Sequence, residues 1–387
     1  MKAVTAIVVG GGLNALGVVR SLGQAGVSVC VLDTDLKSPA MRSRYGIARQ
    51  VSTLEGVEFM SELKRLAPAL GPKVVLFLTE EKTVTTVSEF RAELPPTLLI
   101  ALPEHSRLVA LMHKQGFYDL SEGIGAPVPR TVRLQGLQDL PKVTGLTYPC
   151  VLKPSEKSYE YGARFKKAYK VSSPEEVATL YREIIPVLAD MVVQEWIEGQ
   201  DSDIYFCLQY IGRNGEIVAS FPGRKIRSWP PRIGGTASCT SAWEFEKELT
   251  QLTADFFRQV GFIGMGSMEY KRDARDGRFY MVEPTVGRTD FQQEVATVNG
   301  ANLPYAAYCH ELAMPVPSVR PTCPPRIWRE SQIDRWSKEE SGAADDLAFQ
   351  NHQVVDAHWR WNDLRPWFDH MLIRLNNALP FRLTTGN

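Results

Sequence analysis

The stretch from Gly264 to Arg288 restricts the fold more than any other part of the sequence. Its pattern predicts one strand near Met265–Lys271 and a second near Arg278–Glu283. Between them, Asp273–Gly277 is polar and ends in glycine, which is typical of a turn. The stretch is therefore expected to form a β-hairpin.

Two glutamates belong to this hairpin, Glu269 on the first strand and Glu283 on the second. Side chains alternate between the faces of a strand, and a short turn lets both glutamates lie on one face of adjacent strands. Carboxylates that close repel each other unless one is protonated or a cation lies between them. A Mg²⁺ ion that carries nucleotide phosphates would account for the pair. The alternative is an exposed hairpin with two unrelated surface glutamates.

Composition is that of an ordinary soluble protein and argues against several function classes. The 387 residues are enough for two or three domains. Lys+Arg and Asp+Glu both number 44, so the net charge gives no indication of nucleic-acid or membrane-surface binding. No run of about 18 apolar residues is present, so no integral membrane segment is expected. The six cysteines form no CxxC pair, which favours reduced thiols in a cytoplasmic protein without structural zinc.

The N-terminus has the pattern of a βαβ unit. Val4–Gly10 predicts a buried strand, Gly10-Gly11-Gly12 a tight turn, and the run to Gly26 an amphipathic helix. Val27–Asp33 predicts a second strand that ends in an acid. A helix N-terminus after glycines can hold an anion, and a dinucleotide is one candidate. The spacing GGGLNALG departs from GxGxxG, so the alternative is a doubly wound domain whose turn serves shape or part of a substrate site.

A series of polar and basic motifs runs through the middle of the chain. It starts with a helix at Arg107–Glu122 that has Lys114 near its middle, a connector GAPVPRT, and a strand ending at Lys153-Pro154. A polar segment at Ser155–Lys170, a strand MVVQEWI, an acidic turn and a basic stretch at Gly223–Gly235 follow. The polar segment is typical of a loop that covers phosphates, and equally of an ordinary surface loop.

From about Ala6 to Tyr305, this ordered series resembles the ATP-grasp superfamily, and within it the carboxylate–amine ligases near the D-aspartate ligases and the ligases of exopolysaccharide gene clusters. The resemblance implies an α/β fold whose Rossmann-like pre-ATP-grasp domain spans residues 1–102. Two α+β subdomains that sandwich ATP are expected at 103–190 and 191–312. A small C-terminal extension at 313–387 completes this interpretation.

The resemblance also implies a set of nucleotide contacts. In such enzymes two lysines grip the phosphates, and by position these are Lys114 and Lys153. One acid of the following turn, Asp201 or Asp203, is expected to hold the ribose hydroxyls, with Asp203 preferred. The Ser155–Lys170 segment would close over the phosphates and exclude water. Adenine is expected to contact backbone groups at the end of the strand MVVQEWI, at Gln194, Glu195, Trp196 and Ile197.

For the metal, the resemblance implies that Glu269 and Glu283 bind Mg²⁺ together with phosphates and waters. The family has an asparagine two residues after the second glutamate as a further ligand, and this sequence has Thr285 there. A threonine hydroxyl is a weaker ligand than an amide carbonyl. The presence of Thr285 instead of asparagine therefore affects how strongly the metal binds and, to a lesser degree, the activity. Arg288, one position displaced from the family pattern, is expected to assist the substrate.

The basic stretch at Gly223–Gly235 is the expected substrate loop. In the family interpretation Lys225, Arg227 or Arg232 orients a small carboxylate and stabilises its acyl phosphate, which an amine then attacks. The alternative is a basic surface loop. The partners implied are a carboxylate and an amine of low molecular mass, with no nucleic acid, and the family also suggests a homodimer. No base for the amine can be named from the sequence.

The C-terminal extension departs from the family. Pro315–Pro325 is rich in proline and predicts a linker, and Leu364–Leu375 has the pattern of an amphipathic helix. The tryptophans of this extension could pack it onto the body of the protein, contact a partner, or touch a lipid-linked substrate. Packing is the preferred interpretation. His358 and His370 lack the spacing of metal ligands.

Two other function classes stay open. A non-catalytic ATP-grasp protein that binds ATP and regulates or scaffolds is compatible with Thr285, whereas the retained lysines and glutamates argue against it. A nicotinamide-dependent oxidoreductase would use only the N-terminal domain and leaves the motifs after Pro103 unexplained.

Overall fold

The computed structural model of the 387-residue chain describes residues 5–155, 158–166, 168–232, 234–342 and 351–378. The chain forms two compact units. Unit 1 comprises Met1–His113, Gln200–Glu269 and Pro284–Asn387, and unit 2 comprises Lys114–Gly199 and Tyr270–Glu283. A compact unit can hold more than one domain, so the boundaries expected at 102/103, 190/191 and 312/313 stay predictions. Among the described residues, no helix combines the length and the apolar character needed to cross a bilayer.

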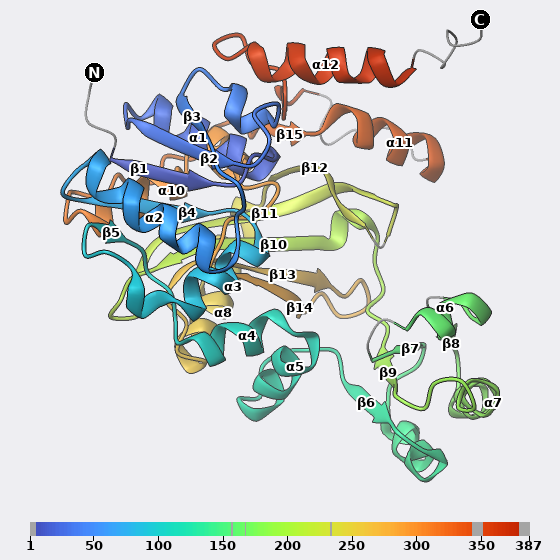
Figure 1. The fold of residues 1–387 in the computed structure, drawn as a ribbon. Helices are drawn as coiled ribbons and strands as arrows, with labels where there is room; N and C mark the ends of the chain where they lie inside the picture. Colours follow the sequence, from blue (N-terminus) through green and yellow to red (C-terminus); the bar gives the residue numbers. More distant parts are fainter. Residues whose placement is uncertain (1–4, 156–157, 167, 233, 343–350, 379–387) are drawn as a thin grey trace, which may run out of the picture. The chain divides into compact units, whose positions relative to one another are not determined.

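Unit 1 begins with a five-stranded parallel sheet, which confirms the expected βαβ start (Figure 1). Its central strands are continuous apolar runs buried on both faces, the pattern of a parallel sheet. The strands, in sheet order, are β3 (Gly46–Gln50), β2 (Val29–Asp33), β1 (Ala6–Val9), β4 (Val74–Leu78) and β5 (Leu98–Leu99). The helices of this part are α1 (Leu13–Gln24), α2 (Gly56–Leu70) and α3 (Glu81–Glu89).

Two of the three glycines let other parts of the domain approach the turn after β1. Gly10 has φ +108°, and a Cβ on it would lie 2.3 Å from Thr79 Oγ1, whereas a Cβ on Gly11 would lie 1.7 Å from Asp33 Oδ2. The shape of the domain therefore requires glycine at these two positions.

The second sheet of the structure has seven strands and includes the predicted hairpin. In sheet order they are β14 (Phe279–Val286), β13 (Gly264–Arg272), β10 (Ile204–Ile211), β11 (Ile217–Trp229), β12 (Gly235–Ser241), β15 (Ile327–Arg329) and β16 (Val354–Asp356). Asp273 N–H donates to Arg278 O at 2.8 Å, so the turn lies where the sequence predicted it. The chain passes between the two units within β13 and β14.

The predicted substrate loop at Gly223–Gly235 is wrong in its extent. Most of it is the second half of β11, which pairs with β12 from Gly223 to Trp229 and with β10 only at Gly223 and Arg224. Only the segment from Pro230 to Gly234 turns between strands, and Ile233 lies outside the described residues. Two prolines and four cations suggested a loop locally, whereas the neighbouring strands decide the conformation.

The predicted helix at Arg107–Glu122 is also wrong, because the chain bends at His113. It forms α4 (His105–Met112) and α5 (Lys114–Gly123), so Lys114 begins the second helix. The remaining helices of unit 1 are α8 (Glu246–Gln259), α9 (Glu294–Val298), α10 (Leu303–Glu311), α11 (Ser331–Ser341) and α12 (Arg365–Ala378).

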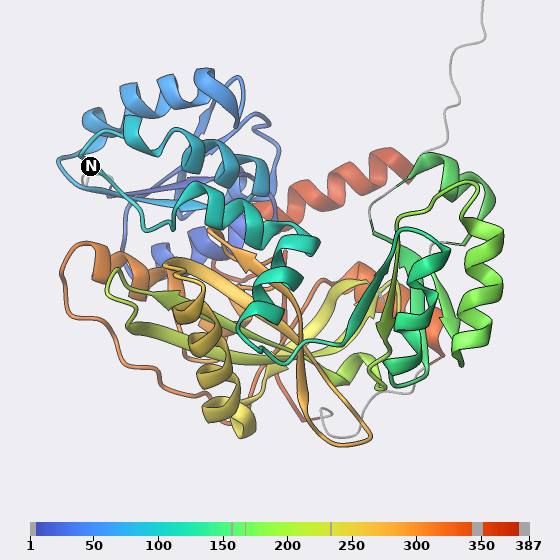
Figure 2. The same ribbon diagram turned by 90° about the horizontal axis from the view of Figure 1, so that it is seen from below.

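Unit 2 contains a four-stranded antiparallel sheet in the order β6 (Thr131–Leu134), β9 (Met191–Glu195), β7 (Cys150–Pro154) and β8 (Tyr169–Val171). Two helices drawn in green in Figure 2, α6 (Tyr159–Arg164) and α7 (Pro174–Ile184), belong to the same unit as α5. The Ser173 hydroxyl accepts the Glu176 N–H and begins α7, as predicted. The polar segment after β7 contains α6, and its residues 156, 157 and 167 lie outside the described residues.

The C-terminal extension packs onto the body of unit 1 through Trp328, which confirms the preferred interpretation for this tryptophan, whereas Trp336, Trp359 and Trp361 are exposed. Trp328 is 1% exposed, and its indole N–H donates to Glu294 Oε2 at 3.1 Å. Arg20 of α1 is fully buried and donates from Nε to Asp363 Oδ2 at 2.9 Å. Asp363 also accepts the Ser43 hydroxyl and the Arg44 N–H. Ser43 and the backbone of Arg44 thus hold the extension, whereas the Arg44 side chain is exposed.

Replacing Asp363 with asparagine should lower the free energy of unfolding by about 3 kcal/mol, because it leaves the Arg20 guanidinium buried without its carboxylate. Urea denaturation followed by circular dichroism measures this change. The matched control is Asp190→Asn, which breaks the half-exposed pair with Arg133 and should cost less than about 1 kcal/mol. Equal losses in the two variants would contradict the assigned role of Asp363.

Of the six cysteines, only Cys323 is exposed. Burial raises the pKa of the Cys30 and Cys150 thiols to about 11 and also raises the pKa of the other three buried thiols. Since the thiolate is the reactive form, native protein at pH 8 should titrate one rapid thiol per chain with a disulfide reagent, and all six after denaturation. Two or more rapid thiols would show that the buried set is accessible.

Candidate functional site

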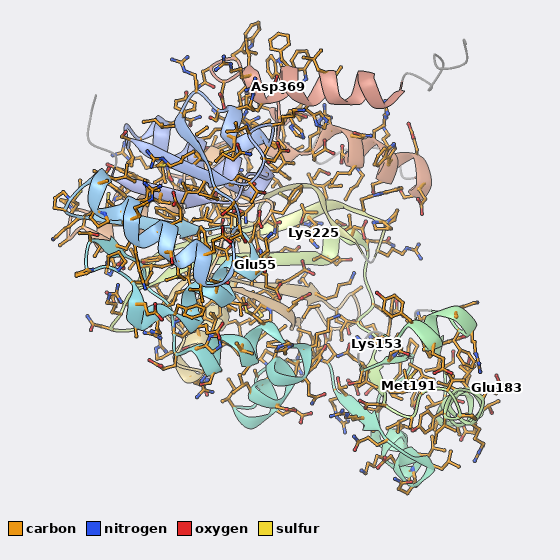
Figure 3. All side chains as sticks on the ribbon, in the orientation of Figure 1. Glu55, Lys153, Glu183, Met191, Lys225 and Asp369 are labelled. Carbon is orange, nitrogen blue, oxygen red and sulfur yellow. The ribbon has the colours of Figure 1, made fainter. Side chains whose placement is uncertain are left out.

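Gln194 organises the polar side chains of the four-stranded sheet in unit 2. It lies on β9 with 8% exposure, between β6 and β7. Its Nε2 donates to the Tyr118 hydroxyl at 2.5 Å and to Thr131 Oγ1 at 2.9 Å. Its Oε1 accepts from Lys153 Nζ at 3.0 Å, so the amide fixes the ammonium group of a lysine that the sequence assigned to phosphate. Lys153 is labelled in Figure 3.

The hydroxyl of Tyr118 takes part in the same cluster. Burial raises the pKa of the Tyr118 phenol, the hydrogen bond from Gln194 lowers it, and the negative charge of Glu283 raises it again. The net effect is a pKa above the ordinary value. Tyr118 therefore stays protonated at neutral pH, and the cluster carries the positive charge of Lys153.

The strand end after Gln194 is already hydrogen-bonded inside unit 2. Glu195 N–H donates to Arg130 O at 2.9 Å, and Trp196 N–H donates to Pro149 O at 3.0 Å. These two N–H groups are therefore unavailable to a bound base, which corrects part of the expected adenine contact. The Lys170 ammonium lies 5.0 Å from the centre of the Trp196 ring, and Ile197 is buried. Lys114 is exposed at the start of α5.

The two acids of the following turn are now distinguished. Asp201 Oδ2 accepts the Ser228 N–H at 3.0 Å, and its Oδ1 accepts the Arg232 N–H at 2.7 Å. Both oxygens of Asp201 thus hold the turn between β11 and β12. Asp203 uses Oδ2 to accept the Gln200 N–H at 2.7 Å, as part of a capping box. The structural task of Asp201 favours Asp203 as the ribose ligand.

Lys225 points into unit 1 from β11 and forms an ion pair with one of the two predicted metal-binding glutamates. Its side chain is 4% exposed, and Nζ lies 2.7 Å from Glu269 Oε2 on β13. A buried ammonium needs such a partner, because its desolvation is costly. The sequence assigned both residues to the site but did not pair them, since they are far apart along the chain. Figure 3 labels Lys225 on its strand.

The other cations of the basic stretch have different surroundings. Arg227 forms a two-pronged contact with Asp334 of α11, with Nε to Oδ1 at 2.7 Å and Nη2 to Oδ2 at 2.9 Å. That guanidinium is committed to the C-terminal extension. Arg232 is exposed in the turn with φ +69°.

The second strand of the hairpin and the residues that follow it contain the remaining predicted residues. Glu283 is exposed in unit 2, whereas Thr285 and Arg288 are half-buried in unit 1. Arg288 Nη1 donates to Thr289 O at 3.2 Å. The sequence analysis gave Thr289 no role. Its buried hydroxyl donates to Asn14 Oδ1, and Asn14 Nδ2 donates to Thr79 O at 3.0 Å.

Asn14 therefore ties the start of α1 to the segment that follows Glu283. In the sequence, Asn14 is only one residue of the glycine-rich turn, and no local pattern indicates that Thr289 is its partner. An asparagine directly after glycines at the start of a helix is the one signal that could have drawn attention to it.

No protein-family model matches the chain. It is 24% identical to the D-aspartate ligase of Enterococcus faecium (strain Aus0004) over 321 residues, which are 77% of this chain and 74% of that protein. Its structure is similar to N5-carboxyaminoimidazole synthetase from Staphylococcus aureus, with a TM-score of 0.62, 12% identity, and coverage of 87% and 85% of the two chains. It is also similar to biotin carboxylase from Campylobacter jejuni in complex with β,γ-ATP, with a TM-score of 0.60, 15% identity, and coverage of 84% and 74%.

Proposed function

The chain has the ATP-grasp fold expected from its sequence, and we propose that it is an ATP-dependent carboxylate–amine ligase that acts through an acyl phosphate. The observation that carries the proposal is the buried ammonium of Lys225 against Glu269. A buried ammonium held against a half-exposed carboxylate adds little to stability, so we take this pair as a candidate functional group. Similarity to the D-aspartate ligase supports an amino acid or a similar small carboxylate as one substrate.

The proposed nucleotide contacts use the residues that the structure describes in each unit. Lys153, held by Gln194, and Lys114 supply cations for phosphate oxygens. Adenine would contact the strand end through the carbonyl groups of Glu195 and Trp196 and through Ile197, because the first two N–H groups are used internally. Asp203 would accept hydrogen bonds from the ribose hydroxyls.

Mg²⁺ fits the donor set. Glu269 and Glu283 are carboxylates, which this hard cation prefers, and Thr285 offers a hydroxyl. Lys225 contacts Glu269 through Oε2, which leaves Oε1 for the ion. When bound, Mg²⁺ would neutralise phosphate charge. We propose Glu269, Glu283 and Thr285 as its protein ligands, and their departure from an asparagine-containing set predicts weaker metal binding.

The proposed reaction requires no protein nucleophile. A substrate carboxylate attacks the γ-phosphoryl group of ATP, forming a C–O–P linkage and releasing ADP. An amine then attacks the acyl carbon, phosphate leaves, and the amine loses a proton as the amide forms. Lys153 and Lys225 would stabilise the negative charge that develops. Arg288 and Arg232 are the residues that we propose to bind the substrate carboxylate. Arg227 is a positioning residue in this proposal, because its guanidinium already binds Asp334.

The cysteines also indicate a cellular location for the protein. Five buried cysteines and no CxxC pair support reduced thiols and a cytoplasmic location. A homodimer remains a proposal, for which sedimentation of the purified chain is the direct measurement.

The test is release of ADP and phosphate from ATP and Mg²⁺, screened against pools of amino acids and other carboxylates combined with pools of amines. Release that requires one carboxylate and one amine would establish the ligase and identify both substrates. Tight ATP binding without turnover across broad pools would overturn it in favour of an ATP-binding protein. In that case Thr285→Asn is the first reversion to make, because it restores the amide ligand of the family.

A further inference from the structure

The C-terminal extension brings together three side chains that the proposed ligase chemistry does not use. Glu330 precedes α11, His358 follows β16, and His370 lies on α12. One potential ligand atom from each lies within 4.8 Å of the others. The sequence spacing of the two histidines gave no indication of a metal site. All three belong to unit 1.

The cluster has a defined geometry. The imidazole rings of His358 and His370 are stacked, with centres 3.9 Å apart and planes at 19°. Glu330 Oε1 lies 3.8 Å from His358 Nε2, and its Oε2 accepts the Ile333 N–H at 2.7 Å. That second bond caps α11, so the carboxylate is fixed with one oxygen directed at the imidazole.

Burial makes the charge of Glu330 significant. Glu330 is 7% exposed and His358 is 6% exposed, and a buried carboxylate requires a compensating positive charge. The guanidinium groups nearby are matched to other carboxylates: Arg20 to Asp363, and Arg360 to Glu294 at 2.9 Å.

Two further acids of neighbouring elements are also committed. Asp334 of α11 pairs with Arg227, and Asp356 of β16 accepts the N–H groups of His358 and Trp359. His358, which lies 3.8 Å from Glu330 Oε1, supplies this charge only when it is protonated, whereas a cation bound at the cluster would supply it directly.

We propose that Glu330, His358 and His370 bind one divalent transition-metal ion of the Zn²⁺ class. Two imidazoles and a carboxylate are ligands that Zn²⁺ accepts, with water in the fourth position. Tetrahedral Zn²⁺ with bonds of about 2.0–2.1 Å spaces its ligand atoms about 3.3 Å apart, so the ligand atoms, which lie within 4.8 Å of one another, would close by at most about 1.5 Å. The stacked imidazole rings would also turn apart on binding, because each nitrogen lone pair lies in its ring plane. The ion would join the start of α11 to α12 and stabilise the extension, because the site exists only in the folded chain.

The test uses the full chain without a histidine tag, stripped with a chelator and dialysed against metal-free buffer. Titration calorimetry with Zn²⁺ should give one site per chain, and the melting temperature should rise with Zn²⁺ concentration. His370→Gln and His358→Gln should each weaken Zn²⁺ binding by roughly 100-fold or more, since even groups behind metal ligands contribute about 10–100-fold. Both variants are first compared with wild type by circular dichroism.

Two controls separate this site from others. His310→Gln removes a half-exposed histidine that lies 3.5 Å from Glu216, a matched histidine–glutamate pair elsewhere, and should bind Zn²⁺ as wild type does. Glu283→Ala removes a proposed Mg²⁺ ligand and should also retain the Zn²⁺ site. If His358→Gln fails to fold, His370→Gln and Glu330→Gln decide, because glutamine keeps an oxygen that can cap α11.

Unchanged Zn²⁺ affinity in His370→Gln would overturn the proposal, as would a wild-type chain that binds no Zn²⁺. A melting temperature that depends on pH through His358 and Glu330 but not on Zn²⁺ would also overturn it. That outcome would assign the cluster to a protonated histidine–carboxylate pair.

Discussion

Glu283→Ala should reduce ATP turnover by at least about 1,000-fold while leaving the fold intact. The side chain is exposed within β14, so its removal empties no core space. Loss of one of two carboxylate ligands removes the stabilisation of phosphate charge, and about 1,000-fold corresponds to about 4 kcal/mol of transition-state stabilisation. ADP release at saturating ATP and Mg²⁺, with the substrates identified by the screen, is the measurement.

The matched control is Glu122→Ala, which removes an exposed glutamate of α5 in the same unit and should retain wild-type turnover. Raising Mg²⁺ should partly restore the activity of Glu283→Ala if Glu269 and Thr285 still hold the ion. Wild-type turnover in Glu283→Ala would remove the metal-site assignment, whereas equal losses in both variants would indicate damage to unit 2.

Lys153→Ala should have a similarly large effect, again about 1,000-fold on kcat/KM for ATP. The Lys153 ammonium is held 3.0 Å from Gln194 Oε1, so it is positioned before ATP binds, and its energetic contribution to phosphate binding is not reduced by ordering of the side chain. Its loss removes a cation from a site where phosphate charge develops. Steady-state kinetics with varied ATP separates the effects on KM and kcat.

Lys142→Ala is the control for this variant, because Lys142 is an exposed lysine of the same unit that pairs with Asp139 and has no proposed contact to ATP. It should keep kcat/KM within about twofold, because the change removes no proposed ATP contact. A Lys153→Ala enzyme with wild-type kinetics would show that phosphate is held by other groups, and Lys114→Ala would then be the next variant.

Much of the backbone could be predicted from local pattern. The strand–glycine–helix–strand start, the α7 cap at Ser173 and the hairpin with its turn at Asp273–Gly277 follow from side-chain periodicity and turn chemistry. These signals act over a few residues, so the sequence contains them completely. The ordered motifs also indicated the ATP-grasp fold.

Local pattern failed where neighbouring strands or distant segments set the outcome. The stretch at Gly223–Gly235 looked like a loop, because it contains four cations and two prolines, yet its residues up to Trp229 belong to β11 and pair with β12. The helix around Lys114 looked continuous, and nothing in its periodicity indicated the bend at His113. In both places the tertiary surroundings outweighed local preference.

The sequence by itself therefore determined the fold class, most of the elements and the charged residues that we propose for ATP and metal binding. Only the tertiary structure decided their partners: Lys225 with Glu269, Arg227 with Asp334, and Glu330 with His358 and His370. Arg20 and Asp363 are separated by 343 positions and still share a buried ion pair. The physical reason is that periodicity places a side chain on one face of its own element, whereas partners depend on which faces the packed core brings together.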